Sequence, residues 1–233
     1  MLRRMSFRLL PKLLLPACVI SLMACNEYYT PPSTSLPMTQ GPSGAPQDSP
    51  HARPTVRFPA RVAVARIEKS GDSFHLVSGA NEEDPAHAAK AASLPGVRAF
   101  VPLNRVALTG SVKSYRELDR EALKMGADIL AVYRYDTDVA VNDAFEPLTL
   151  ATLGFAPTIK HETSSVVTLI VRDARTGYVY GVLEERADRG GVTTGMTLYG
   201  SGRNAKKFTR KQAMDRLMER LPGFWNGILA KGR

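Results

Sequence analysis

The chain of 233 residues is 44% hydrophobic, 23% charged and 7% aromatic, which is typical of one globular domain of ordinary size. Its two cysteines exclude a disulfide scaffold, and no internal run approaches the roughly 20 apolar residues of a membrane-spanning helix. The formal net charge is +9, but four of the 31 basic residues stand in the first 24 positions, where there is no acid. The other 27 basic residues face 22 acidic ones, a weak excess that does not point to nucleic acid.

The first 25 residues have the pattern of a secretory signal. Four basic residues near the start precede an apolar stretch at 13–24 that is too short to be a permanent membrane helix. The stretch ends in Leu22-Met23-Ala24-Cys25, which resembles the lipobox of bacterial lipoproteins. This resemblance implies cleavage after Ala24 and attachment of diacylglycerol and an N-acyl chain to Cys25. The alternative is an ordinary signal peptide, 1–24, followed by a stray cysteine.

The cysteine count fits a lipidated Cys25. Cys18 would leave with the signal, so the exported domain would carry no free thiol. A left-over cysteine in an exported protein needs an explanation, and acylation supplies one. By the same resemblance, Asn26 favours the outer membrane, where several acyl chains hold a protein more firmly than one chain does. We therefore expect a lipid-anchored protein of the bacterial outer membrane that faces the periplasm.

The lipidated cysteine is followed by a predicted tether at 25–55. Residues 26–55 include seven prolines and only three charged side chains. Such a composition cannot offset the entropy of ordering, so the segment is predicted to be disordered and partly polyproline-like. The folded domain is expected to span 56–233.

The first part of this domain is predicted to alternate strands and helices. Alternating apolar residues indicate a strand at 61–67 and a weaker one at 74–77. Asp84-Pro85 marks a helix start, with Asp as N-cap and Pro at the first helical position, and the helix is expected to run to Ser93. An extended segment at 97–106 follows, with a proline that places it at a sheet edge or a bulge.

A capping box formed by Ser114 and Glu117 predicts the next helix, which is expected to end at Gly126. The apolar run that begins at Ile129 predicts a buried strand continuing towards Val141. A connection at 142–163 is expected after this strand.

The rest of the chain is predicted to hold two strands and one helix. Strands at 166–172 and 178–186 are joined by a hairpin with Gly177 where positive φ is favoured. A glycine-rich loop at 189–202 precedes a helix that Asn204 caps and Pro222-Gly223 breaks. The order β-α-β-α-β-β-β-α predicts an α/β (α+β) fold: a single domain with a mixed β-sheet flanked by helices.

Catalytic and metal-binding patterns are not evident in the sequence. There is no Gly-x-Ser-x-Gly or Ser-x-x-Lys, and the four histidines are scattered, so we expect them at the surface. His161-Glu162 begins like a zinc-protease motif, but Ser165 stands where the second histidine ligand is needed. We expect no catalytic residues, no metal and no cofactor apart from the covalent lipid on Cys25.

One connection is unusually apolar. Residues 145–159 are almost without charge, whereas loops are ordinarily polar, and an exposed apolar connection often marks a contact. Either the segment packs as core or lengthens its neighbouring strands, or it serves in oligomerisation, partner docking or membrane insertion. The candidate interaction residues are Phe145, Leu148, Leu150, Leu153, Phe155 and Ile159.

The stretch from Tyr115 to Val132 resembles the helix, Gly-Ala-Asp and strand unit of envelope lipoproteins. Curli secretion-channel lipoproteins and penicillin-binding-protein activator lipoproteins share this unit, and the early Arg-Val-Ala-Val-Ala strand, the Asp173…Thr176-Gly177 turn and the C-terminal helix also suit that group. In length and layout, the chain is closer to the small rhombotarget lipoproteins. The resemblance covers roughly 61–229 and implies a fold, with no enzymatic residues to transfer.

The function expected from this resemblance is that of a non-catalytic periplasmic interaction domain, accessory to envelope assembly or secretion. Its partners would be the membrane, through the lipid anchor, and an unidentified envelope protein, with homo-oligomers as an open case. Nucleic acid is excluded as a partner because export separates the protein from it. The alternative is a subunit of an oligomeric secretion pore of curli-channel type. A channel subunit needs two long alternating hairpins, and 145–159 offers one short candidate.

Overall fold

The computed structural model of the chain describes residues 52–70, 73–77, 84–103, 108, 110–143, 152–153, 155–194 and 197–232. The predicted signal, Cys25 and nearly all of the predicted tether lie outside these residues. The described residues before the first strand are bonded to the domain. Thr176 Oγ1 donates to the carbonyl oxygen of Arg53 at 2.9 Å, and the backbone N–H of Thr55 donates to Asp173 Oδ2 at 2.7 Å.

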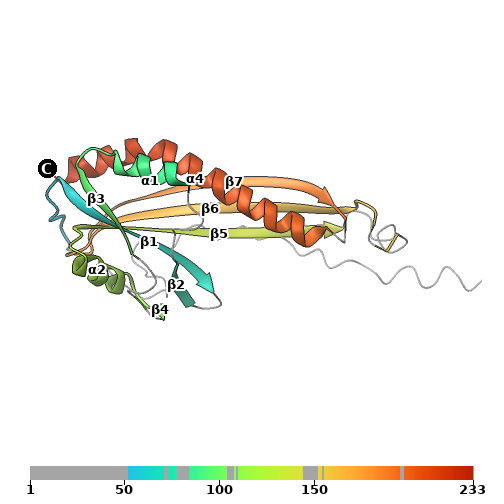
Figure 1. The fold of residues 1–233 in the computed structure, drawn as a ribbon, viewed down its shortest axis with the longest axis horizontal. Helices are drawn as coiled ribbons and strands as arrows, with labels where there is room; N and C mark the ends of the chain where they lie inside the picture. The colour runs from blue at the N-terminus through green and yellow to red at the C-terminus, as the bar shows by residue number, and fades with distance from the viewer. Residues whose placement is uncertain are drawn as a thin grey trace, which may run out of the picture.

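A mixed sheet of seven strands forms the centre of the fold (Figure 1). The strand order is β4-β2-β1-β5-β6-β7, and β3 also pairs with β1. β1 is parallel to β3 and β5, whereas the remaining pairs are antiparallel. The strands are β1 (Ala60–Ser70), β2 (Ser73–Val77), β3 (Val97–Pro102), β4 (Ser111–Val112), β5 (Ile129–Asp143), β6 (Ile159–Asp173) and β7 (Val179–Thr193).

The described helices cover both faces of the sheet. α1 (Pro85–Ala92) and α4 (Leu198–Lys231) lie on one face, and α2 (Tyr115–Lys124) lies on the other (Figure 1). Each face therefore has its own hydrophobic core. The larger core lies under α4 and the smaller one under α2. The predicted fold class, a single domain with a mixed sheet and flanking helices, is confirmed.

Local sequence signals explain the two shorter helices. Asp84 caps α1 through its side chain, which accepts from the N–H of Ala86 at 3.0 Å. α2 begins differently from the predicted capping box, because Ser114 makes no side-chain cap bond. Instead, Glu117 Oε2 accepts from the N–H of Lys113 at 3.0 Å, one residue earlier. Gly126 ends this region with φ +70°, as its position predicts.

The three last strands extend beyond the rest of the sheet. β1 pairs with β5 only as far as Arg134, whereas β5, β6 and β7 remain paired to their ends. We call the projecting part of these strands, 135–143, 159–167 and 185–193, the arm. α4 covers one face of the arm (Figure 1), and Ser165 Oγ lies 2.7 Å from Thr209 Oγ1. At about 1.5 Å per residue, the 34 residues of α4 span about 50 Å, similar to the length of these strands.

Four sequence predictions about this half of the chain are wrong. The connection predicted at 142–163 is shorter, because β6 begins at Ile159 instead of 166. β7 continues to Thr193 through the expected glycine-rich loop. α4 begins at Leu198, before the predicted Asn204 cap. Pro222 lies inside α4 and does not break it, because residues on both sides of it are held in the core, among them Leu221 and Trp225.

No helix in the described part of the chain has both the length and the apolar character required to cross a membrane.

Candidate binding site

An apolar slot of about 360 Å³ lies between α1 and α4, above the sheet. Its floor consists of aliphatic and aromatic residues of three neighbouring strands. Tyr133, Ala131 and Leu169 are buried residues of the sheet that line the slot, so the slot reaches down to the sheet. The floor residues are Val62 and Val64 of β1, Ala131 and Tyr133 of β5, and Leu169 and Val171 of β6.

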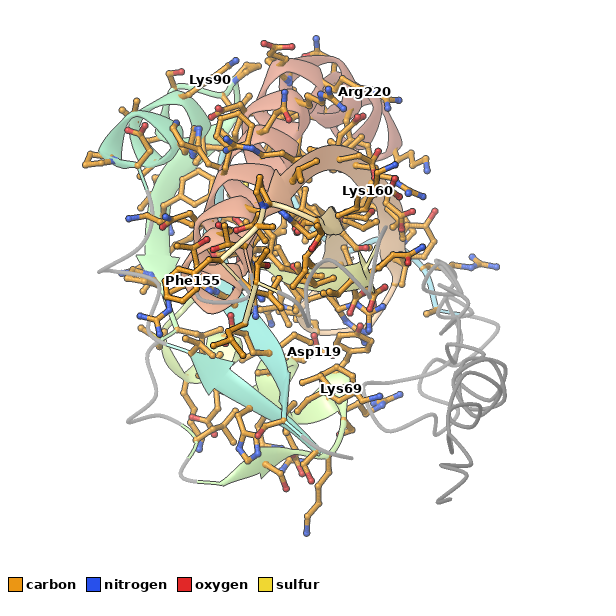
Figure 2. All side chains as sticks on the ribbon, turned by 90° about the vertical axis from the view of Figure 1, so that its right-hand side faces the viewer. Lys69, Lys90, Asp119, Phe155, Lys160 and Arg220 are labelled. Atoms are coloured by element: carbon orange, nitrogen blue, oxygen red, sulfur yellow. The ribbon has the colours of Figure 1, made fainter. Side chains whose placement is uncertain are left out.

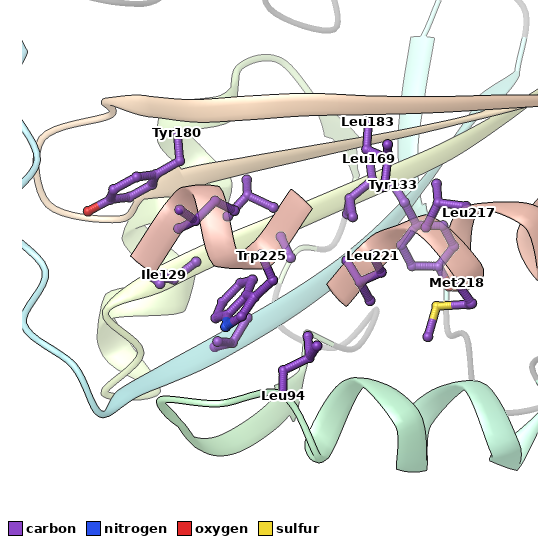
Figure 3. Packing of buried hydrophobic residues seen from close by; sticks show 14 of the residues in the cluster. Leu94, Ile129, Tyr133, Leu169, Tyr180, Leu183, Leu217, Met218, Leu221 and Trp225 are labelled. Atoms are coloured by element: carbon purple, nitrogen blue, oxygen red, sulfur yellow. The ribbon is translucent and has the colours of Figure 1, made fainter. Parts of the chain in front are cut away.

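The two walls of the slot differ in side-chain size. α4 contributes large side chains, whereas α1 contributes Ala88, Ala91 and His87. Leu94, directly after α1, points towards Trp225 and Leu221 of α4 (Figure 3). The α4 wall is formed by Met214, Leu217, Met218, Leu221 and Trp225.

The sequence of α1 explains why the space is not filled. Its eight residues, PAHAAKAA, include five alanines, and none of the eight is buried. Alanine favours the helix but has only a methyl group to offer the core. A helix with so little apolar side chain cannot close the distance to α4, and the slot is the result.

Polar pairs hold α1 against α4 along one edge of the slot. His87 Nε2 lies 2.8 Å from Asp215 Oδ1, and Lys211 Nζ lies 3.3 Å from both Asp84 Oδ2 and Asp215 Oδ1. The hydrogen bonds that Lys211 donates to Asp84 and Asp215 raise the pKa of Lys211. The N–H of Ala86, followed by Lys211, lowers the pKa of Asp84. Lys211, Asp84 and Asp215 are exposed and His87 is half-buried, so these pairs position α1 more than they stabilise it.

A hydrogen bond fixes the opposite end of the slot. Trp225 Nε1 donates to the carbonyl oxygen of Pro95 at 2.9 Å, which ties α4 to the turn after α1. The indole is 2% exposed and meets Phe58 edge to face at 6.2 Å between ring centroids. The slot is therefore closed by Trp225 and bordered by charged groups near Met214.

The structure separates the residues that the sequence singled out as a candidate interaction segment. Leu153 and Phe155 are 83% and 66% exposed, between β5 and β6 at the end of the arm, where Figure 2 labels Phe155. Ile159 is 8% exposed and begins β6, so it belongs to the sheet. Phe145, Leu148 and Leu150 lie outside the described residues.

Other exposed apolar side chains lie near the same end of the molecule. Val139 and Val141 of β5, Val192 of β7 and Phe208 of α4 are between 43% and 58% exposed. The guanidinium of Arg189 lies 4.4 Å from the ring centroid of Phe208. Together with Leu153 and Phe155, they make up six of the seven exposed large hydrophobic residues that the structure describes. These exposed apolar side chains are thus concentrated on the arm, on the connection at its tip and on the part of α4 beside it.

The expectation of surface histidines is wrong for His161. This residue is 7% exposed and lies in β6, not in a long loop. Its ring covers Gly191 of the neighbouring strand, and an added Cβ there would lie 2.6 Å from His161 Cε1. His161 and Gly191 fit each other in the arm, which gives this histidine a packing role.

The comparisons with known proteins do not name a function. No family model and no curated protein matches the chain. Solved structures that are similar to it include a DUF330 protein from Xanthomonas campestris, with 10% identity, coverage of 79% of this chain and 92% of the other, and a TM-score of 0.33. A PelC dodecamer from Paraburkholderia phytofirmans has 13% identity, coverage of 72% and 94%, and a TM-score of 0.30. The hypothetical protein CT253 from Chlamydia trachomatis has 13% identity, coverage of 71% and 96%, and a TM-score of 0.30.

Proposed function

We propose that the protein is an outer-membrane lipoprotein whose domain is a non-catalytic periplasmic interaction module, accessory to envelope assembly or secretion. The observation that carries the proposal is the concentration of exposed apolar side chains on the arm. Contiguous exposed apolar surface on a folded domain marks a contact with a partner. Leu153 and Phe155, at the far end, are the centre of this proposed contact.

The construction of the arm supports this role. Three paired strands with α4 on one face hold the tip away from the base of the sheet, so a partner reaches it without steric hindrance from α2 (Figure 1). Leu153 has φ +49°, a left-handed conformation that is unfavourable for a branched side chain. Residues with a strained backbone occur most often at functional sites, which supports a role for this exposed leucine in binding a partner.

The outer edge of β7 favours an accessory role. It argues against the alternative, a pore in which copies of the chain pair with one another through their strands. α4 reaches across this edge with two basic side chains. Arg216 donates to the carbonyl oxygen of Arg186, and Lys231 Nζ donates to that of Tyr180 at 2.7 Å. Carbonyl groups that are occupied in this way do not accept a strand from a neighbour, which is a common protection of sheet edges.

The lipid anchor is tested by fractionation of cells that express the full chain. Cys25→Ser is expected to abolish acylation and to move the protein out of the membrane fraction. Cys18→Ser is the matched control, because this residue would be removed with the signal, and its acylation and membrane attachment should be unchanged. Retention of an unacylated Cys25→Ser protein in the membrane would contradict the anchor.

The arm is tested by substitution at its tip. Leu153→Ser combined with Phe155→Ser leaves the fold intact, because both side chains are exposed, and is expected to remove the protein from any complex seen by native mass after detergent extraction. Leu123→Ser is the control, since Leu123 is 38% exposed on α2, away from the arm. If the double variant and the control keep the same complex, the arm is not its interaction surface. A closed ring that contains this chain alone would favour the pore alternative.

A further inference from the structure

We infer that the slot between α1 and α4 is a binding site for a single unbranched acyl chain, with α1 as its lid. This inference does not depend on the proposed function of the arm. It is based on the dimensions of the slot, on the chemistry of its lining and on the weak attachment of α1.

The dimensions of the slot suit one extended chain. The α4 residues that line it run from Met214 to Trp225, eleven helical steps that span about 16 Å at 1.5 Å per residue. A volume of about 360 Å³ spread over that length is an elongated space. An α-helix, about 10–12 Å in diameter with its side chains, is too wide for it. A long, flexible apolar ligand such as an acyl chain fits this shape.

The lining selects the same chemistry. The residues that line the slot include no Asp, Glu, Lys or Arg. A sugar, nucleotide or polar peptide placed there would lose its hydration without gaining hydrogen bonds along the slot, which is costly. The flexible side chains of Met214 and Met218 adapt to an irregular apolar guest. An acyl chain needs no fixed polar partner, and the burial of each of its methylene groups favours binding.

The two ends of the slot give the ligand a direction. Charged side chains border the slot near Met214, where His87 meets Asp215 and Lys211 meets Asp84. A polar headgroup therefore remains at this end, in water, while the tail runs towards the buried Trp225. At this end Lys211 and His87 lie against the carboxylates of Asp84 and Asp215. The site therefore selects a ligand by its apolar chain and not by the charge of its headgroup.

α1 is attached in a manner that permits opening. It contributes no fully buried side chain, and its links to α4 are polar pairs at the slot edge together with the half-buried Ala91. Elements with few buried apolar contacts open at low cost in free energy. Movement of α1 away from α4 exposes the full length of the slot without disturbing the sheet.

Trp225 provides the test, because it is the only tryptophan of the sequence and it closes the slot. The full chain is extracted in dodecyl maltoside and exchanged into the same detergent brominated near the end of its alkyl chain. Bromine quenches indole emission on contact, and a buried Trp225 is reached only by a chain that has entered the slot. We expect most of the tryptophan emission to be lost.

Matched variants on the two faces of α1 separate binding from other contacts with detergent. Ala91→Phe and the smaller Ala88→Leu fill the slot, and both should retain the emission. Ala89→Phe lies outside the slot and should lose emission as the wild type does. Thermal unfolding identifies a variant that fails to fold, in which case the other slot variant decides. Unquenched emission in the wild type, or equal quenching in a folded slot variant, would overturn the inference.

Discussion

Arg172 of β6 and Asp119 of α2 form a buried ion pair, with 2.9 Å between Nη2 and Oδ2. Their side chains are 1% and 8% exposed, and the guanidinium also lies 5.1 Å from the ring centroid of Tyr115. The pair joins the helix to the face of the sheet opposite α4. Because both charges have left water, each depends on the other for compensation.

Removal of one member of this pair is expected to be severe. Asp119→Leu should lower the free energy of unfolding by about 3–5 kcal/mol, because it leaves Arg172 buried without its carboxylate. Urea denaturation measures the loss. The double variant with Arg172→Met should recover most of it, since two apolar side chains restore a consistent interior. A double variant as unstable as Asp119→Leu alone would show that the charge is not the cause.

Asp173 connects the hairpin after β6 to the segment before β1. Its Oδ2 accepts from Thr55 N and Thr55 Oγ1 at 2.7 and 2.8 Å, and its Oδ1 accepts from the N–H groups of Arg175 and Thr176 at 2.8 and 3.1 Å. Asp173→Ala should cost about 3 kcal/mol or more, since several bonds to a buried carboxylate are lost together. Thr55→Val removes one bond and should cost about 1.5 kcal/mol. Equal losses in chemical denaturation would argue against a shared carboxylate.

Gly96 is expected to tolerate no side chain. It has φ +74°, and an added Cβ would lie 2.9 Å from Leu229 Cδ2 and 3.2 Å from Phe58 Cδ1. Gly96→Ala should therefore lower the melting temperature, with a cost in free energy of about 1–2 kcal/mol from the backbone alone. Gly227→Ala is the control in α4, where nothing lies within 4 Å of the added Cβ. That change should raise stability by up to about 1 kcal/mol.

The stability should fall in alkaline solution partly through Tyr180. Burial, followed by the nearby Asp173, raises the pKa of Tyr180 to about 12, above the value near 10 of an exposed tyrosine. Its neutral form thus stabilises the fold fully below about pH 10, and this contribution is lost as the pH rises from about 10 to about 12. Tyr180→Phe removes the contribution. Chemical denaturation at several alkaline pH values gives the free energy of unfolding at each pH. This free energy should fall less steeply between about pH 10 and 12 in the variant than in the wild type, and an equal fall in both would contradict the assignment.

The sequence predicts most elements of the first half of the domain, because they carry apolar periodicity or helix-start signals, although it does not predict β4 and Ser114 does not cap α2 through its side chain. The second half differs because polar residues are buried there in pairs. Ser165 lies 3.0 Å from Thr137 Oγ1 and 2.7 Å from Thr209 Oγ1, oxygen to oxygen, so a hydroxyl at an apparent strand end is part of the interior. Gly191 continues β7 because the ring of His161 occupies the space of a side chain. Contacts of this kind between neighbouring elements cannot be predicted from the spacing of hydrophobic residues in the sequence.

The slot was beyond sequence prediction for a related reason. The pattern at Asp84-Pro85 predicts α1 correctly, and its alanines mark it as a good helix. Whether the small side chains of α1 leave a cavity depends on the helix that faces them. That helix is α4, whose lining residues stand more than a hundred positions later in the sequence. The exposure of Leu153 and Phe155, by contrast, fits one of the two alternatives that the apolar composition of 145–159 left open.

The position of α4 in the chain bears on how the domain folds. This last helix supplies Ala213, Leu217, Trp225 and Ile228 to the larger core, and every strand of the arm lies under it. Without α4, the apolar face of β5, β6 and β7 lacks most of the large side chains that cover it. The larger core therefore closes only when α4 packs on strands that precede it in the chain, so the arm and this core are expected to become ordered together.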